Sequence, residues 1–163
     1  MNFEKLFAMQ KGLDDHIESN HHLGIEDLFD RKVLALLVEL GELANETRCF
    51  KFWSLKPSAP RETVLEEYVD GVHFILSLGI ECGFTTEQSY SAEIAKKESI
   101  TEQFIYMFDV IGQFKQQRSL ENYKIVFQAY LQLGEALGFQ ASETEEAYIK
   151  KNEVNYKRQQ EGY

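Results

Sequence analysis

The chain of 163 residues is long enough for one folded domain, and its composition, 44% hydrophobic and 27% charged, excludes an intrinsically disordered segment. No apolar run approaches the roughly 20 residues of a membrane helix, and the first residues lack a signal-peptide pattern, so we expect a cytoplasmic protein without a membrane partner. The net charge of −10 opposes binding to a phosphate backbone, and we expect no nucleic-acid partner.

Apolar residues recur at helical spacing through almost the whole chain, whereas strand-like alternation is hard to find. In chain order, we predict helices over residues 2–20, 27–47, 61–82, 86–97, 100–117, 120–137 and 143–160. The segment 48–60 holds both prolines and the only tryptophan, and we predict a loop there. No repeat or linker divides the chain, so the prediction is a single all-α domain over residues 1–163, folded as a helical bundle.

Several helix ends carry local signals. Three pairs have the spacing of a capping box, namely Thr85 with Gln88, Ser99 with Glu102, and Ser142 with Glu145. Three glycines stand where a left-handed residue would end a helix: Gly24, Gly83 and Gly138. Two cysteines without metal-binding spacing, Cys49 and Cys82, suit a reducing compartment.

The predicted helix 27–47 combines an apolar face with an acidic one. Four aliphatic residues are expected in the core: Leu34, Leu37, Val38 and Leu40. Glu39, Glu42 and Glu46 interrupt this apolar run at spacings of three and four, which places them on one face of the helix.

The predicted helix 61–82 repeats this arrangement. Glu67 and Asp70 are three residues apart, and His73 and Ser77 continue the same face. A solvated acidic face is the simpler interpretation of either pair alone. Two such pairs on strongly apolar helices would repel each other unless cations lay between them, and Mg²⁺ prefers such hard oxygen ligands. The spacing therefore favours a metal site.

Three separated stretches carry a family resemblance. They are LLVELGELANETRCFKFWS, LEEYVDGVHFILSLG and the terminal KNEVNYKRQQEGY. The first two contain the ExxE and ExxD pairs typical of all-α nucleoside triphosphate pyrophosphatases, which include MazG-like enzymes. Together, in this order, the three resemble the dimeric dUTPases, particularly those of Gram-positive bacteria and their phages. The resemblance implies a homodimeric dUTP diphosphatase that uses Mg²⁺ to hydrolyse dUTP, and also dUDP, to dUMP.

The resemblance also implies roles for single residues. The Mg²⁺ ligands would be Glu39, Glu42, Glu67 and Asp70, with Glu39 or Glu42 activating the attacking water. The uracil and deoxyribose pocket would include Gln10, Trp53 and His73, with Asp14 where some relatives have an amide. The phosphates would bind Lys151, Asn155 and Arg158, which share one helical face in the C-terminal segment 143–163, a possible lid.

Alternatives stay open at this point. Trp53 and His73 also fit a core position, and the C-terminal stripe also fits a solvated helix. A broader MazG-like pyrophosphatase would use the same carboxylates on several nucleotides. A regulatory protein that binds a repressor, as associated with phage relatives, is the alternative outside enzymes.

Overall fold

Six α-helices make up the regular structure of the described part of the chain, which is residues 1–24, 26–87 and 89–162 of a computed structural model. The described residues contain no strand, which confirms the predicted all-α fold. None of these helices is long and apolar enough to cross a membrane. The helices are α1 (Phe3–Asn20), α2 (Phe29–Thr47), α3 (Arg61–Glu81), α4 (Ile100–Gln116), α5 (Leu120–Ala136) and α6 (Ala141–Gln160).

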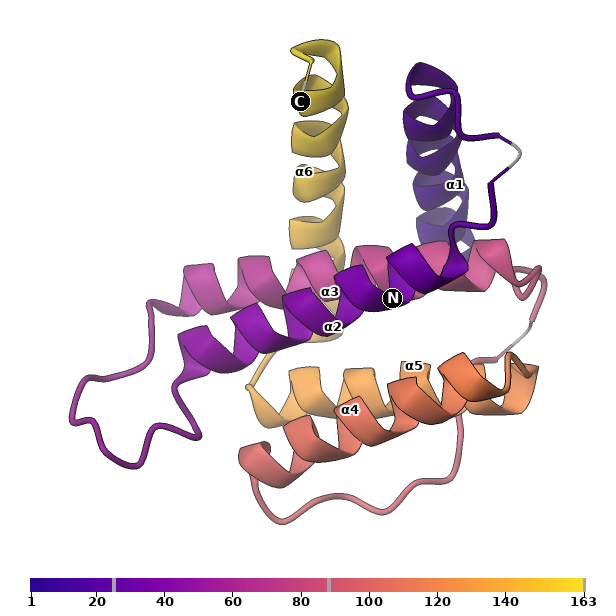
Figure 1. Cartoon of the computed structure of the whole chain (residues 1–163). Coiled ribbons are helices and arrows are strands. Elements are labelled where there is room, and N and C mark those ends of the chain that lie inside the picture. Colours follow the sequence, from indigo (N-terminus) through magenta and orange to yellow (C-terminus); the bar gives the residue numbers. More distant parts are fainter. Residues whose placement is uncertain (25, 88, 163) are drawn as a thin grey trace.

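The helices are arranged as three pairs (Figure 1). Helices α2 and α3 lie side by side in the middle, joined by residues 48–60, and α4 and α5 pack below them. Helices α1 and α6 project from the other side and run parallel. Asn2 hydrogen-bonds Glu145 near their base, whereas His21 Nε2 lies 3.1 Å from Gln159 Oε1 near their tips. The α2/α3 pair therefore lies between a packed layer and a projecting pair.

The contact between α3 and α5 depends on two glycines. A Cβ atom added at Gly71 would lie 2.0 Å from the Tyr130 hydroxyl oxygen, and one at Gly134 would lie 2.4 Å from that of Tyr68. The two tyrosines stack at 4.8 Å, and each hydroxyl donates to the backbone carbonyl of the other residue. This close approach fixes α3, the helix that carries Glu67 and Asp70.

The helix ends follow the predicted signals in part. The Ser99–Glu102 capping box begins α4, and Gly83 and Gly138 have left-handed φ angles of 73° and 81°. Two predictions were wrong. The capping box of α6 is Gln140 with Glu143, not Ser142 with Glu145, and the left-handed residue after α1 is His22 with φ 58°, not Gly24. The predicted partner of Thr85, Gln88, lies outside the described residues.

The predicted helix over 86–97 was wrong, because its described residues are not helical. Tyr90 explains the difference. Its side chain is buried, its ring stacks on Phe127 of α5 at 5.0 Å and meets Phe3 of α1 edge-on, and its hydroxyl donates to the Phe84 carbonyl oxygen. Contacts with two distant helices thus hold this segment in an irregular path.

Two residues predicted in the core lie on the surface. Leu40 is fully buried and Leu37 is partly buried, but Leu34 is 63% exposed and Val38 is 48% exposed. The neighbouring helix α4 also exposes large apolar side chains, with Ile105 at 59% and Phe108 at 42%. We call these four residues the α2/α4 apolar face. An apolar side chain at helical spacing can belong to an exposed face as well as to a core.

Candidate functional site

Carboxylates from α2 and α3 converge beside α6. One oxygen from each of Glu39, Glu67 and Asp70 lies within 4.8 Å of the others, which is close enough for one metal ion to contact all three. The convergence follows from the spacing of three between Glu67 and Asp70 and from the packing of α2 along α3. We call these three residues the carboxylate cluster.

The carboxylate cluster concentrates negative charge that a cation would stabilise. Burial, followed by repulsion from Asp70, raises the pKa of Glu39 to about 7. Burial also raises the pKa of Glu67 and Asp70, in spite of a nearby lysine. Hard carboxylate oxygens in this number match the preference of Mg²⁺, so the donor set fits the ion that the resemblance implies.

The predicted ligand Glu42 lies at the edge of this cluster. Its side chain is exposed, and it is not among the three converging residues. Its charge still contributes to the raised pKa of Glu39 and of Glu67, so it lies close to both. Glu42 therefore stays a predicted ligand with a more peripheral place than the other three.

A lysine from α6 reaches the cluster. Lys151 Nζ lies 2.7 Å from Asp70 Oδ2 and 2.9 Å from Glu66 Oε1, and the lysine side chain is only 10% exposed. Glu66 was not among the predicted site residues, although its spacing of four before Asp70 places both on one helix face. Glu66 and Asp70 thus hold the ammonium group of Lys151 next to the carboxylate cluster.

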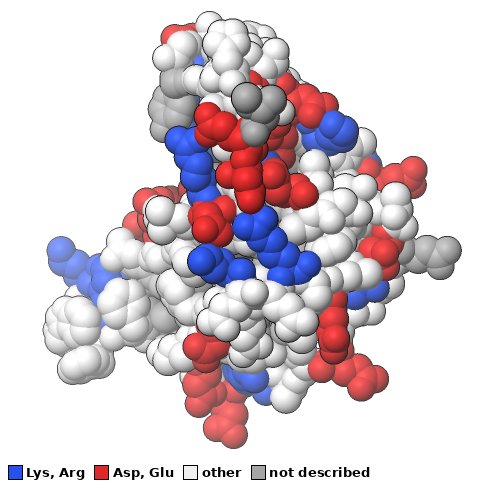
Figure 2. Space-filling model, turned by 45° about the vertical axis from the view of Figure 1, so that its right-hand side comes forward, with Lys and Arg blue, Asp and Glu red and all other residues white. Residues whose placement is uncertain are grey.

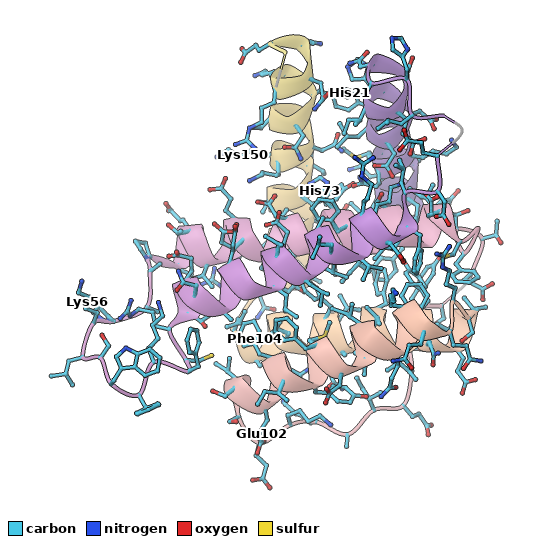
Figure 3. The ribbon with its side chains drawn as sticks, in the orientation of Figure 1. His21, Lys56, His73, Glu102, Phe104 and Lys150 are labelled. Carbon is cyan, nitrogen blue, oxygen red and sulfur yellow. The ribbon has the colours of Figure 1, made fainter. Side chains whose placement is uncertain are left out.

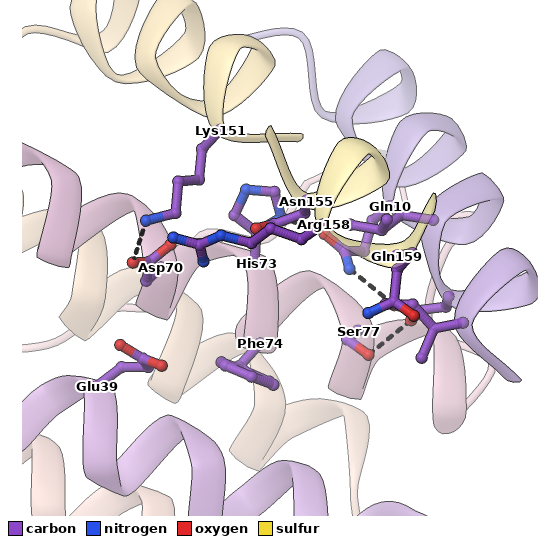
Figure 4. Close-up of a pocket in the computed structure, with 13 residues that line it drawn as sticks. Gln10, Glu39, Asp70, His73, Phe74, Ser77, Lys151, Asn155, Arg158 and Gln159 are labelled. Carbon is purple, nitrogen blue, oxygen red and sulfur yellow. Dashed lines mark hydrogen bonds and ion pairs between the residues drawn. The ribbon is translucent and has the colours of Figure 1, made fainter. Parts of the chain in front are cut away.

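A cavity of about 290 Å³ extends from the cluster between α1, α3 and α6 (Figure 4). It is lined by Gln10, Leu13, Asp14, Ile17, Glu39, Asp70, His73, Phe74, Ser77, Lys151, Asn155, Arg158 and Gln159. The cavity brings together Glu39 of α2 and most of the predicted site residues of α1, α3 and α6. Of the predicted residues, Glu42, Glu67 and Trp53 do not line it.

The far end of the cavity is a hydrogen-bonded polar network. Gln10 Nε2 donates to Asp14 Oδ1 at 2.8 Å, and Ser77 Oγ donates to Asp14 Oδ2 at 2.6 Å. His73 lies between α3 and the projecting helices (Figure 3), with Nδ1 2.8 Å from Gln10 Oε1. The Tyr148 hydroxyl donates to the same oxygen. We call these five residues the polar network. Tyr148 was not among the predicted site residues, because an aromatic residue in a helix is typical of a core position.

The ring of His73 is neutral. Burial, followed by the charge of Lys151, lowers its pKa to about 3. Its Nε2 is buried and has no hydrogen-bond partner among the described residues. The ring also stacks on Tyr148 at 4.2 Å. His73 thus lines the cavity and carries one buried polar atom that no described protein group satisfies.

Trp53 lies away from the cavity in segment 48–60. Its side chain is 65% exposed and meets Phe52 and Phe50 edge-on, at 5.0 and 6.0 Å between ring centroids. This excludes a core position for Trp53.

The comparison with known families decides between the enzyme classes. A family model for dUTPase matches residues 2–163, nearly the whole chain. The chain belongs to the dUTPase family. The predicted dUTPase family is thereby confirmed, and the activity is that of a dUTP diphosphatase, which hydrolyses dUTP to dUMP and pyrophosphate. A search of curated proteins finds no match.

The cavity of this dUTPase combines acidic and basic side chains. Acidic side chains are spread over the face in Figure 2, with basic ones gathered among them, in keeping with the net charge of −10. Lys151 and Arg158 both line the cavity next to the carboxylate cluster.

Proposed function

We propose that this dUTPase uses Mg²⁺ held by the carboxylate cluster, with Glu42 at its edge. The observation that carries the proposal is the convergence of Glu39, Glu67 and Asp70 beside the basic side of one cavity. When bound there, Mg²⁺ would neutralise phosphate charge and lower the pKa of the attacking water.

The protein's own side chains would divide the remaining work. Glu39 belongs to the cluster and also lines the cavity, so we assign it to orient the attacking water and accept its proton. Glu42 is the second candidate for this role. Lys151, Asn155 and Arg158 would bind the phosphates, because two cations and an amide face the cavity beside the cluster.

The nucleoside would occupy the far end of the cavity. Gln10, Asp14 and His73 lie there, and their polar atoms offer both hydrogen-bond donors and acceptors. Uracil selection would then combine these hydrogen bonds with a wall that leaves no room for the methyl group of thymine. The same site would accept dUDP, because one phosphate fewer still reaches the cluster.

Trp53 would cover the base in the loaded enzyme. An exposed aromatic ring on the segment between α2 and α3 supports this, since aromatic faces stack well on bases. A non-hydrolysable dUTP analogue with Mg²⁺ should change the fluorescence of this only tryptophan, and dTTP should do so weakly. An unchanged spectrum at saturating analogue would contradict the proposal.

A homodimer would cover the α2/α4 apolar face. Leu34 with Val38, and Ile105 with Phe108, are pairs at helical spacing on neighbouring helices, and monomeric proteins seldom expose such faces. Sedimentation should show a dimer at micromolar concentration, and the double variant Leu34→Glu/Val38→Glu should sediment as a smaller species. A stable, active wild-type monomer would contradict it.

A nucleotide panel tests the proposed function as a whole. We expect hydrolysis of dUTP and dUDP in the presence of Mg²⁺, little hydrolysis of dTTP, dCTP or UTP, and none after chelation. Similar rates on all five nucleotides would instead indicate a broad pyrophosphatase of the MazG-like type.

A further inference from the structure

Lys32 stands behind the polar network and has no part in the function proposed so far. It lies on α2, and its side chain is 12% exposed. Its Nζ lies 2.7 Å from Glu81 Oε2, 3.3 Å from Glu18 Oε1 and 3.8 Å from Asp14 Oδ2. Burial alone would lower the pKa of Lys32, but its acidic neighbours raise it overall, so the amine stays charged.

The charge of Asp14 sets the orientation of Gln10. An ionised carboxylate only accepts hydrogen bonds, and its Oδ1 lies 2.8 Å from the Gln10 side-chain amide. The amide nitrogen must therefore face Asp14, because the reversed amide would place two oxygens against each other. Gln10 Oε1 then faces His73.

The orientation of Gln10 sets the tautomer of His73. An amide oxygen only accepts hydrogen bonds, so His73 Nδ1, 2.8 Å away, must carry the proton. A neutral imidazole carries one N–H group, which leaves Nε2 as an acceptor. That acceptor is the buried atom without a partner among the described residues.

We propose that Lys32 is a positioning residue, which acts through Asp14 and Gln10 to hold His73 in the tautomer that accepts a hydrogen bond from the nucleoside. The inference rests on the nucleoside site proposed above. The matching donor is either the N3–H of uracil or the 3′-hydroxyl of the sugar. Neutral cytosine has no N3–H, so the first donor would also contribute to selection of the base.

Lys32 is needed because Asp14 is buried. Burial raises the pKa of Asp14 overall, although hydrogen bonds from Ser77 and Gln10 and the charge of Lys32 lower it. Without the positive charge of Lys32, a larger fraction of Asp14 is protonated. A protonated Asp14 can donate to Gln10 Oε1, the amide can turn, and the His73 tautomer is no longer fixed.

Long-range ¹H–¹⁵N NMR of ¹⁵N-histidine-labelled protein tests the tautomer without any turnover. The chain has four histidines, and His73→Asn identifies the signals of His73 by their loss. We expect the pattern of a neutral Nδ1–H ring in wild type and in Lys32→Arg, and a mixture of tautomers in Lys32→Met. An Nε2–H ring or an imidazolium in wild type overturns the proposal.

Kinetics then test the consequence. We expect Lys32→Met to raise the KM for dUTP about tenfold and to change kcat by no more than about twofold, because one hydrogen bond to the nucleoside is lost. Lys32→Arg should restore the wild-type KM. The control Lys11→Met removes an exposed ion pair with Asp15 and should leave both constants unchanged. An unchanged KM in a folded Lys32→Met contradicts the proposal.

Two analogues identify the donor. Wild type should bind either 3-methyl-dUTP or 2′,3′-dideoxy-UTP more weakly than dUTP. The group that is missing from the weaker analogue, the N3–H or the 3′-hydroxyl, is the donor to His73. Equal affinity for all three overturns the inference even if Lys32→Met does not fold. Absence of dUTP hydrolysis by wild type would instead overturn the proposed function and leave the tautomer assignment standing.

Discussion

The two ends of the cavity handle buried charge in opposite ways. In the polar network, each oxygen of Asp14 accepts a hydrogen bond from the protein, and Lys32 supplies a cation from behind. In the carboxylate cluster, three acidic groups share a small volume, Lys151 pairs with Asp70 alone among them, and the pKa of Glu39 rises to about 7.

From this difference we infer a recognition end, at the polar network, and a reaction end, at the carboxylate cluster. Groups that are satisfied within the protein are rigid and present a fixed pattern to a ligand. Carboxylates that repel each other in the free protein attract a cation, and a bound metal ion would relieve their repulsion and could then contact phosphate oxygens. Substitutions at the two ends should therefore change different kinetic constants.

The largest effect is expected at the reaction end. Asp70→Asn should lower kcat roughly 10²–10³-fold while the circular dichroism of the helices is retained, because the amide keeps the shape but loses the ligand charge. Glu66→Gln is the matched control, since Glu66 shares Lys151 with Asp70 but lies outside the cluster. Turnover of Asp70→Asn within a few-fold of wild type would refute the assignment.

The phosphate contacts should give the next largest effect. Arg158→Ala should weaken binding of a non-hydrolysable dUTP analogue by about 1.5–3 kcal/mol, the scale of a hydrogen bond to a charged group. Calorimetry of the same variant with deoxyuridine should show little change. Lys157→Ala, an exposed neighbour that does not line the cavity, is the control. Equal losses in the two variants would indicate only a general effect of charge.

A smaller effect is expected at the recognition end. Ser77→Ala removes one hydrogen bond to buried Asp14, and should raise the KM for dUTP by about threefold to tenfold with little change in kcat. It should also lower the free energy of unfolding by about 1 kcal/mol. Ser91→Ala, on an exposed segment, is the control. A fall in kcat without a change in KM would place Ser77 at the reaction end instead.

The smallest effect concerns stability without metal. The folded-state pKa of Glu39 is about 7, above the ordinary value of 4.5, so its ionisation costs stability as pH rises between these values. In a chelator, Glu39→Gln should raise the melting temperature by about 2–4 °C at pH 8 and by almost nothing near pH 4.5. Thermal denaturation at both pH values measures the difference in melting temperature between the variant and wild type. A lower melting temperature of Glu39→Gln at pH 8 would contradict the prediction.

The sequence predicted the features that depend on local spacing. The helices and the pairing of Glu67 with Asp70 follow from helical periodicity. The dUTPase family could be recognised from three sequence stretches without knowledge of the tertiary structure. The non-helical path around Tyr90 was missed because its partners, Phe3 and Phe127, are far away in the chain.

The same limit applies at the site. Tyr148 reaches the polar network through the packing of α6 against α1 and α3, and Lys32 reaches it by a long side chain that extends from α2 to Asp14 of α1. No spacing within one helix signals either contact. The exposure of Leu34 and Val38 also depends on which helices cover α2, since periodicity alone does not tell a core from a surface face.

Metal binding tests the central claim most directly. Titration of the protein with Mn²⁺, a substitute for Mg²⁺ whose free form is visible by electron paramagnetic resonance, measures binding in the presence of a non-hydrolysable dUTP analogue. The account predicts loss of the free Mn²⁺ signal with wild type and Glu66→Gln, and much weaker loss with Glu67→Gln. Equal binding by Glu67→Gln and wild type would contradict the carboxylate cluster as the metal site.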